Sequence, residues 1–320
     1  DDALEYHAQA LEIQIKHLGL NHKDVASTYD QIGCVYFDQG DYDEALDAYK
    51  KSLKIRLRVL GPIHKDVANS YCNIANIYYS QGNYDAALDM YRKGLDIQFK
   101  VSKEINPNIA SLYNNIGNVY SEKGKLDEAL ENYERALAIQ LKVYGENHPD
   151  VAGSLNNIGS LLSQKGNYDE ALEYYLQAID IRFKLLGDCH PDVAASYNNI
   201  GNVYSNIGNF EEALVNYRKA LRIELNALGC YHPNVAISFN NIGSVYYYEG
   251  NFKEALINYK KALDIQKRIY GNMHPDVAIS HNNIGDVHYE IKGFKEALIN
   301  YQKGLDMQMK IFGLYHNDAA

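Results

Sequence analysis

HPDVAASYNNIGNVYSNIGNFEEALVNYRKALRIELNALGCY, residues 190–231, is one copy of a segment that recurs along the chain. Its opening string, His-x-Asp-Val-Ala or a close variant, returns at intervals of 42 residues without insertion. Copies begin at His22, His64, His148, His190, His232 and His274, with Asn106 in the remaining place and a degraded copy at His316. Because independent domains would not keep a constant interval, the sequence predicts an uninterrupted repeat array.

Each copy contains two stretches with the spacing of apolar residues that is typical of amphipathic helices, here called helix A and helix B. Proline stands at the first position of helix A, where its missing N–H has no helical partner. A glycine closes helix A, where a left-handed residue is usually required, and helix B ends near a second glycine. In the last full copy Lys292 replaces the glycine after helix A and Gly293 follows it, so we expect that turn to be displaced by one residue. The prolines are Pro107, Pro149, Pro191, Pro233 and Pro275; the glycines are Gly40, Gly82, Gly124, Gly166, Gly208 and Gly250 after helix A, and Gly61, Gly145, Gly187, Gly229, Gly271 and Gly313 after helix B.

The aligned positions resemble tetratricopeptide repeats of the 42-residue kind, similar to kinesin light chain and nephrocystin arrays. The matching residues of the first repeat are Tyr29, Ile32, Gly33 and Tyr36 in helix A, and Ala45, Tyr49 and Ser52 in helix B. This resemblance implies an all-α fold, a right-handed superhelical solenoid of antiparallel helix pairs. We expect residues 1–320 to form a single array, in which 1–21 is helix B of a preceding repeat, 22–315 are seven repeats and 316–320 start an eighth. Neither end has the polar capping repeat that solenoids need, so we expect a longer array or end-to-end docking of repeats.

Composition narrows the classes of partner and compartment. A net charge of −10 lacks the basic excess that nucleic acid or an anionic membrane surface requires. The chain has only four scattered cysteines, which is typical of a reducing compartment. Residues 1–20 carry charge throughout, so we expect no targeting segment there, and no apolar run is long enough to cross a membrane. We therefore expect a cytoplasmic protein that binds neutral or basic protein segments, without nucleic-acid or membrane partners.

The sequence contains no motif that predicts catalysis or a cofactor. It has no Gly-x-Gly-x-x-Gly, no phosphate-binding loop and no His-Glu-x-x-His. The repeated histidines lie 42 residues apart with no second ligand nearby, whereas zinc needs three or four convergent ligands. His281 and His288 occupy aromatic positions of helix A, and we expect packing roles for them. The chain is predicted not to be an enzyme and to bind no metal.

Asparagines recur at three positions of helix A beside its packing stripe. Asn is a mediocre helix former, so helix stability does not explain this asparagine ladder. The resemblance places these positions on the concave groove of the solenoid, where an amide can bond the N–H and C=O of an extended peptide. The alternative is that the amides bridge neighbouring helices, and one column can do each job. The predicted peptide-binding residues are Asn73, Asn76, Asn114, Asn115, Asn118, Asn156, Asn157, Asn198, Asn199, Asn202, Asn240, Asn241, Asn282 and Asn283, together with Tyr247 and Tyr289.

Charges are predicted to divide between the two faces. Repeats of this family that clamp the carboxylate of heat-shock chaperones carry Lys and Arg in the groove, whereas this chain has Asn, Ser and acids there. Lys and Arg concentrate on helix B, which predicts a solvated convex face: Lys50, Lys51, Arg92, Lys93, Arg218, Lys219, Lys260 and Lys261.

The sequence therefore predicts a protein-interaction scaffold that binds extended peptide segments in its groove through the asparagine ladder. Two alternatives stay open. The array can be the sensor or regulatory arm of a larger signalling NTPase or protease, or a structural spacer in a large assembly.

Overall fold

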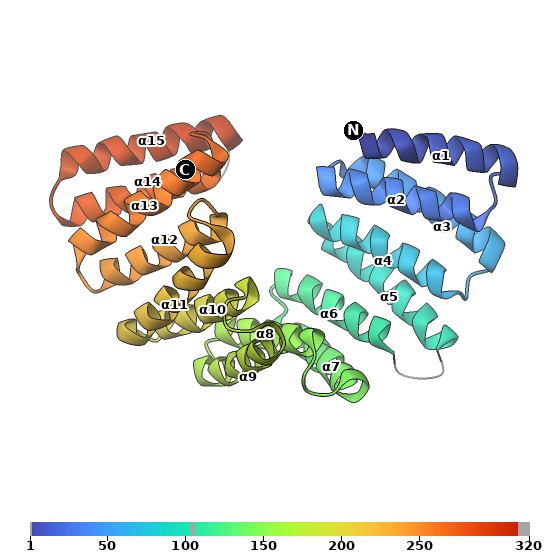
Figure 1. The fold of residues 1–320 in the computed structure, drawn as a ribbon, viewed down its shortest axis with the longest axis horizontal. Coiled ribbons are helices and arrows are strands. Elements are labelled where there is room, and N and C mark those ends of the chain that lie inside the picture. Colours follow the sequence, from blue (N-terminus) through green and yellow to red (C-terminus); the bar gives the residue numbers. More distant parts are fainter. Residues whose placement is uncertain (1, 103–105, 313–320) are drawn as a thin grey trace. The chain divides into compact units, whose positions relative to one another are not determined.

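The computed structural model describes residues 2–102 and 106–312, and every regular element in these ranges is an α-helix. The fifteen helices form a tetratricopeptide-type solenoid of antiparallel pairs, as predicted (Figure 1). The predicted helix end at Gly313 and the start of an eighth repeat at 316–320 lie outside the described residues.

The chain divides into two compact units, Asp1–Glu146 and Asn147–Ala320. In the first unit, α1 (Asp2–Leu18) is a lone helix B, and three A/B pairs follow: α2 (Lys23–Gln39) with α3 (Tyr42–Leu60), α4 (Lys65–Ser80) with α5 (Tyr84–Val101), and α6 (Pro107–Glu122) with α7 (Leu126–Tyr144). The second unit contains four pairs: α8 (Pro149–Gln164) with α9 (Tyr168–Leu186), α10 (Pro191–Asn206) with α11 (Phe210–Leu228), α12 (Pro233–Tyr248) with α13 (Phe252–Tyr270), and α14 (Pro275–Glu290) with α15 (Phe294–Phe312).

The repeated histidines cap helix A. In six repeats the histidine has an extended backbone and its ring Nδ1 accepts a hydrogen bond from the backbone N–H two residues later, at 3.1–3.2 Å. A helix start leaves such N–H groups without helical partners, and the ring satisfies one of them. The residues that the periodicity marks most strongly are therefore N-caps.

Helix A and helix B of one repeat meet through a glycine and a tyrosine. Gly201 lies against the ring of Tyr217, and a Cβ atom added to Gly201 would lie 2.7 Å from the ring carbon Cε1. Tyr217 is almost completely buried. The pair recurs in most repeats, while Ala75 stands at the glycine position against Tyr91. This contact gives the Tyr49-type tyrosines a role in packing helix B against helix A.

The predicted displacement of the turn at Lys292 is wrong. Helix α14 ends at Glu290, the position equivalent to the end of α12 at Tyr248. Lys292 itself adopts the left-handed conformation, with φ of 61°, and the N–H of Gly293 bonds the carbonyl of His288 at 2.8 Å. The hydrogen bonds that close the turn thus hold a lysine in a conformation that usually favours glycine.

Among the described residues, none of the helices combines the length and the apolar character needed to cross a membrane. All four cysteines are free thiols.

Candidate peptide-binding face

The asparagine ladder lies on helix A, at positions i, i+1 and i+4 of each repeat, here called columns one, two and three. In the second unit α10 contacts both α8 and α12, so consecutive A helices lie side by side and form one face. The structure separates the three columns, because each has different hydrogen-bond partners.

Column one belongs to a polar seam between helices. Asn198 donates to the Glu224 carboxylate on α11 at 2.9 Å and accepts from the Ser238 hydroxyl of the next repeat at 3.2 Å. In the first repeat the column-one residue is Asp30, which forms an ion pair of 2.5 Å with Arg56. These side chains hold helices together, so the bridging alternative describes column one in these two repeats.

The seam continues across most junctions between repeats through a hydroxyl group, whereas the third repeat has Leu112 at the corresponding position. A helix B side chain meets a serine or threonine fourteen residues later, on the following helix A, at 2.5–2.8 Å. The pairs are Gln14 with Thr28, Arg56 with Ser70, Arg182 with Ser196, Glu224 with Ser238, and Gln266 with Ser280.

Glu224 is a buried carboxyl with only 1% of its surface exposed. Burial raises the pKa of Glu224 above its ordinary value, and the hydrogen bonds from Ser238 and Asn198 oppose that rise. No Lys or Arg of the described chain forms an ion pair with it. The folded state therefore retains a proton on this group that the unfolded chain releases near pH 4.5.

Replacing Glu224 by Gln is expected to raise the free energy of unfolding at pH 7 by about 1 kcal/mol. With a raised folded-state pKa, the wild-type chain loses stability as the pH rises from 4.5 through the folded-state value, and Gln removes this loss. Gln266 already fills the equivalent position against Ser280. Urea denaturation from pH 4 to pH 8 measures the effect, and parallel pH profiles for the two proteins would contradict it.

Column three is held by the buried tyrosine of helix B. The Tyr217 hydroxyl donates to Oδ1 of Asn202 at 2.6 Å, and the same bond joins Tyr91 to Asn76 and Tyr133 to Asn118. Since the hydroxyl proton needs an acceptor, each amide turns its oxygen inward. The Nδ2 donors of Asn76, Asn118 and Asn202 have no partner among the described residues.

Column two keeps most of its hydrogen-bonding groups available. The side chains of Asn73, Asn115, Asn157, Asn241 and Asn283 are half-buried and form no hydrogen bond to another described residue. Asn199 donates through Nδ2 to Asn156 at 2.9 Å, which leaves its own Oδ1 as an acceptor.

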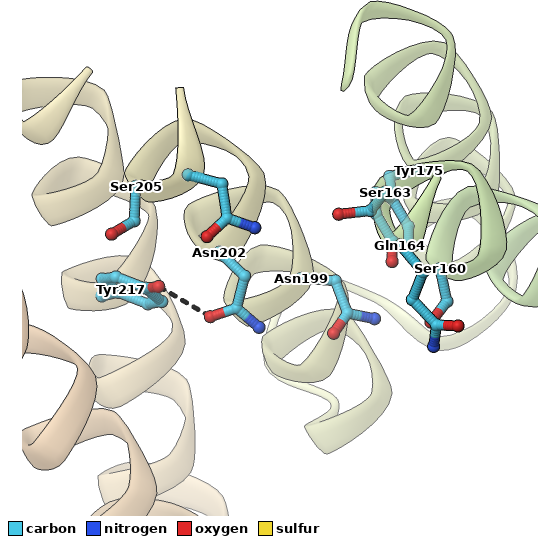
Figure 2. Close-up of a pocket in the computed structure, with 9 residues that line it drawn as sticks. Ser160, Ser163, Gln164, Tyr175, Asn199, Asn202, Ser205 and Tyr217 are labelled. Carbon is cyan, nitrogen blue, oxygen red and sulfur yellow. Dashed lines mark hydrogen bonds between the residues drawn. The ribbon is translucent and has the colours of Figure 1, made fainter. Parts of the chain in front are cut away.

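A cleft of about 400 Å³ lies between α8 and α10. Figure 2 shows Ser160, Ser163 and Gln164 on one side of this cleft and Asn199 and Asn202 on the other, with Tyr217 bonded to Asn202. The remaining lining residues are Tyr175, Ser205 and Asn206, so none of the lining side chains carries a charge at neutral pH.

The structure brings only part of the predicted site together. Of the predicted residues, Asn199 and Asn202 line the cleft, while Asn156 orients Asn199 and Asn198 lies in the seam. Asn240 and Asn282 are the remaining column-one positions of the second unit; Oδ1 of Asn240 is buried without a partner, and Asn282 packs against Gly304. Asn114 is the column-one residue of the third repeat.

Sequence reasoning missed the next turn of helix A. Ser163, Gln164, Ser205 and Asn206 line the cleft one helical turn beyond column three, and their spacing of 42 residues was the available signal. The predicted aromatic residues occupy these same positions in the last two repeats. Tyr247 bonds Glu290 at 3.5 Å, and Tyr289 is exposed and packs edge-on against Phe294.

Comparisons with known proteins agree with this architecture. A tetratricopeptide repeat family model matches residues 1–58, 35–98, 108–183, 192–268 and 235–310. A search of curated proteins found no match.

Solved structures share the fold at low sequence identity. The repeats of a putative kinesin light chain of Podosopora anserina are 24% identical, with a TM-score of 0.56 over 65% of this chain and 98% of that one. Aspartyl phosphate phosphatase F of Bacillus subtilis is 18% identical, with a TM-score of 0.69 over 96% and 76%. The quorum sensor NprR of B. thuringiensis is 18% identical, with a TM-score of 0.74 over 95% and 82%. With the family match along most of its length, the chain belongs to the tetratricopeptide repeat family and is a protein-interaction scaffold.

Proposed function

We propose that this scaffold binds extended peptide segments of partner proteins on its helix A face, through columns two and three of the asparagine ladder. The observation that carries the proposal is the pair of amide groups in the cleft of Figure 2. Asn199 offers an acceptor and Asn202 offers a donor, because their other amide atoms are bonded to Asn156 and Tyr217. A peptide unit needs one of each, for its N–H and its C=O.

The ligand expected in this cleft is uncharged. The lining consists of hydroxyl and amide side chains, which bond polar neutral groups and give no ionic compensation to a desolvated charge. The lining also has no carboxylate, imidazole or thiol, the groups that most often serve in acid–base or nucleophilic catalysis. We therefore propose binding rather than catalysis for this face.

The test is the double variant Asn199→Ala and Asn202→Ala. A peptide is first selected from a displayed random library against the wild-type chain, and its Kd is then measured by fluorescence anisotropy. Loss of two hydrogen bonds, each worth about 0.5–1.5 kcal/mol, is expected to raise the Kd about tenfold.

The control is Asn226→Ala, which removes an exposed amide from α11, outside the cleft lining. It should leave the Kd unchanged. Asn198 is not used in this test because its bonds to Glu224 and Ser238 make its removal a change in packing. Because Asn202→Ala also removes the acceptor of the Tyr217 hydroxyl, the Kd is measured at a temperature at which circular dichroism shows the double variant to be folded. An unchanged Kd in the folded double variant would refute the proposal.

A further inference from the structure

One outward position of helix B changes its chemistry along the chain. In the first four repeats it is acidic, as Asp47, Asp89, Glu131 and Glu173. In the last three it is aliphatic, as Val215, Ile257 and Ile299, with exposed fractions of 38%, 39% and 45%. These three side chains lie on α11, α13 and α15 of the second unit and are too exposed to contribute much to the core.

Replacement of the acidic residue by an aliphatic one removes the ion-pair partner of a basic residue on the same helix. In the first three repeats the acid forms an ion pair with Lys51, Lys93 or Arg135 four residues later, at 2.6, 2.7 and 2.6 Å. In the fifth and sixth repeats the cations remain as Lys219 and Lys261. No carboxylate of the described chain pairs with either of them.

Lys219 and Lys261 are held in place without being neutralised. Each ammonium group lies 5.1 Å from the centroid of an aromatic ring, that of Tyr197 for Lys219 and that of Phe239 for Lys261. A ring face positions a cation but leaves its net charge intact. The outer surface of α11 and α13 therefore presents an aliphatic side chain and an uncompensated positive charge one helical turn apart, twice.

An apolar cleft of about 380 Å³ adjoins Lys261. Its walls include Leu225, Phe239 and Ile265, with Lys260 and Lys261 at its edge. The acid in the lining, Asp264, is paired with Arg268 at 3.3 Å. Arg268 also donates to the hydroxyl of Tyr231 at 2.5 Å and fixes that ring beside the cleft.

We propose that this surface of α11 and α13 is a second docking site, for an acidic amphipathic segment of a partner protein. Carboxylates of the segment pair with Lys219, Lys260 and Lys261. Its apolar side chains cover Val215 and Ile257 and enter the cleft between Leu225 and Phe239. Because the chain carries a net charge of −10, an acidic ligand is attracted by these local cations and not by the protein as a whole. This site is separate from the helix A face and does not depend on the peptide proposed there.

The decisive variant combines Val215→Glu with Ile257→Glu. It recreates the i, i+4 ion pair that the first three repeats already contain, so the fold has a place for it. The same change removes the apolar surface and neutralises both lysines. The matched control is Ile237→Glu with Ile279→Glu, which adds the same charge at two exposed isoleucines of helix A, each 50% exposed and outside the cleft lining.

The probe is a fluorescein-labelled amphipathic peptide of Glu, Leu and Phe, compared with a scrambled peptide of the same composition. The wild-type chain should bind the patterned peptide at least about tenfold more tightly than the scrambled one, and more weakly at high salt. The Glu variant should lose this preference, while the helix A control and the Asn199→Ala, Asn202→Ala variant should keep it.

Three results would overturn the proposal. The first is equal binding of the patterned and scrambled peptides, and the second is unchanged binding by the Glu variant. The third is concentration-dependent self-association of the wild-type chain in sedimentation that the Glu variant abolishes, because this would assign the surface to a second copy of the chain.

Discussion

Replacing Arg56 by Gln is expected to lower the free energy of unfolding by about 3 kcal/mol. The Arg56 guanidinium pairs with Asp30 and donates to the Ser70 hydroxyl at 2.8 Å and to the Asp66 carbonyl at 3.3 Å. Burial raises the pKa of the Asp30 carboxyl, and Arg56 opposes the rise. Without the arginine, Asp30 becomes a partly buried carboxylate with no cation beside it, which is the costly way to break an ion pair.

The control for Arg56 is the double variant with Asp30→Asn. It places Asn and Gln at positions that Asn240 and Gln266 occupy in the sixth repeat, so the chain itself shows that this combination folds. Most of the lost stability should return. Urea denaturation measures the total effect, and amide exchange in α2 to α4 shows whether it is local. Equal losses in the single and double variants would mean that the ion pair is not the cause.

Replacing Gly201 by Val is expected to cost about 3 kcal/mol, since even a single Cβ atom there would lie 2.7 Å from the Tyr217 ring. Tyr217 cannot yield easily, because it is buried and its hydroxyl is bonded to Asn202. Ala75 shows that one repeat accommodates a methyl group at this position, which is why the larger valine is used. Thermal unfolding followed by circular dichroism gives the measurement.

Gly153→Val is the matched control for Gly201. Gly153 also lies in a helix A of the second unit, but a Cβ atom there meets nothing within 4 Å. Its replacement should change stability by less than about 0.5 kcal/mol, since Gly and Val are both weak helix formers. If both valine variants lost the same stability, helix propensity and not the tyrosine contact would explain the effect.

The fold could be predicted in detail because it depends on local rules that repeat. The 42-residue period predicted where both helices of each repeat lie. The proline and glycine positions predicted where these helices begin and end. Lys292 was the exception. Glycine is favoured over other residues at left-handed positions by only a modest free energy. The hydrogen bonds that close the turn at Lys292 outweigh it.

The candidate sites could be predicted only in part, because their properties depend on contacts between helices. Three asparagine columns look alike in the sequence. Only the structure shows that Asn198 forms a hydrogen bond with Glu224 and that Asn202 forms one with Tyr217. Most side chains of column two form no hydrogen bond to another described residue. Likewise, the change from Asp47 to Ile257 is visible in the sequence, but its meaning depends on finding Lys261 over a ring with no carboxylate partner.

The hydroxyl groups of the polar seam affect how readily whole repeats can be added to such a chain or removed from it. Ser238 and Ser280 donate to carboxylate and amide oxygens, whereas Ser70 and Ser196 accept from guanidinium groups. One small side chain thus joins to Glu, Gln or Arg with no change in the backbone around it. A repeat that carries this hydroxyl group can then be duplicated, deleted or exchanged during evolution, since Glu, Gln and Arg of a preceding repeat all bond to it. The third repeat, with Leu112 at this position, offers no such hydroxyl group.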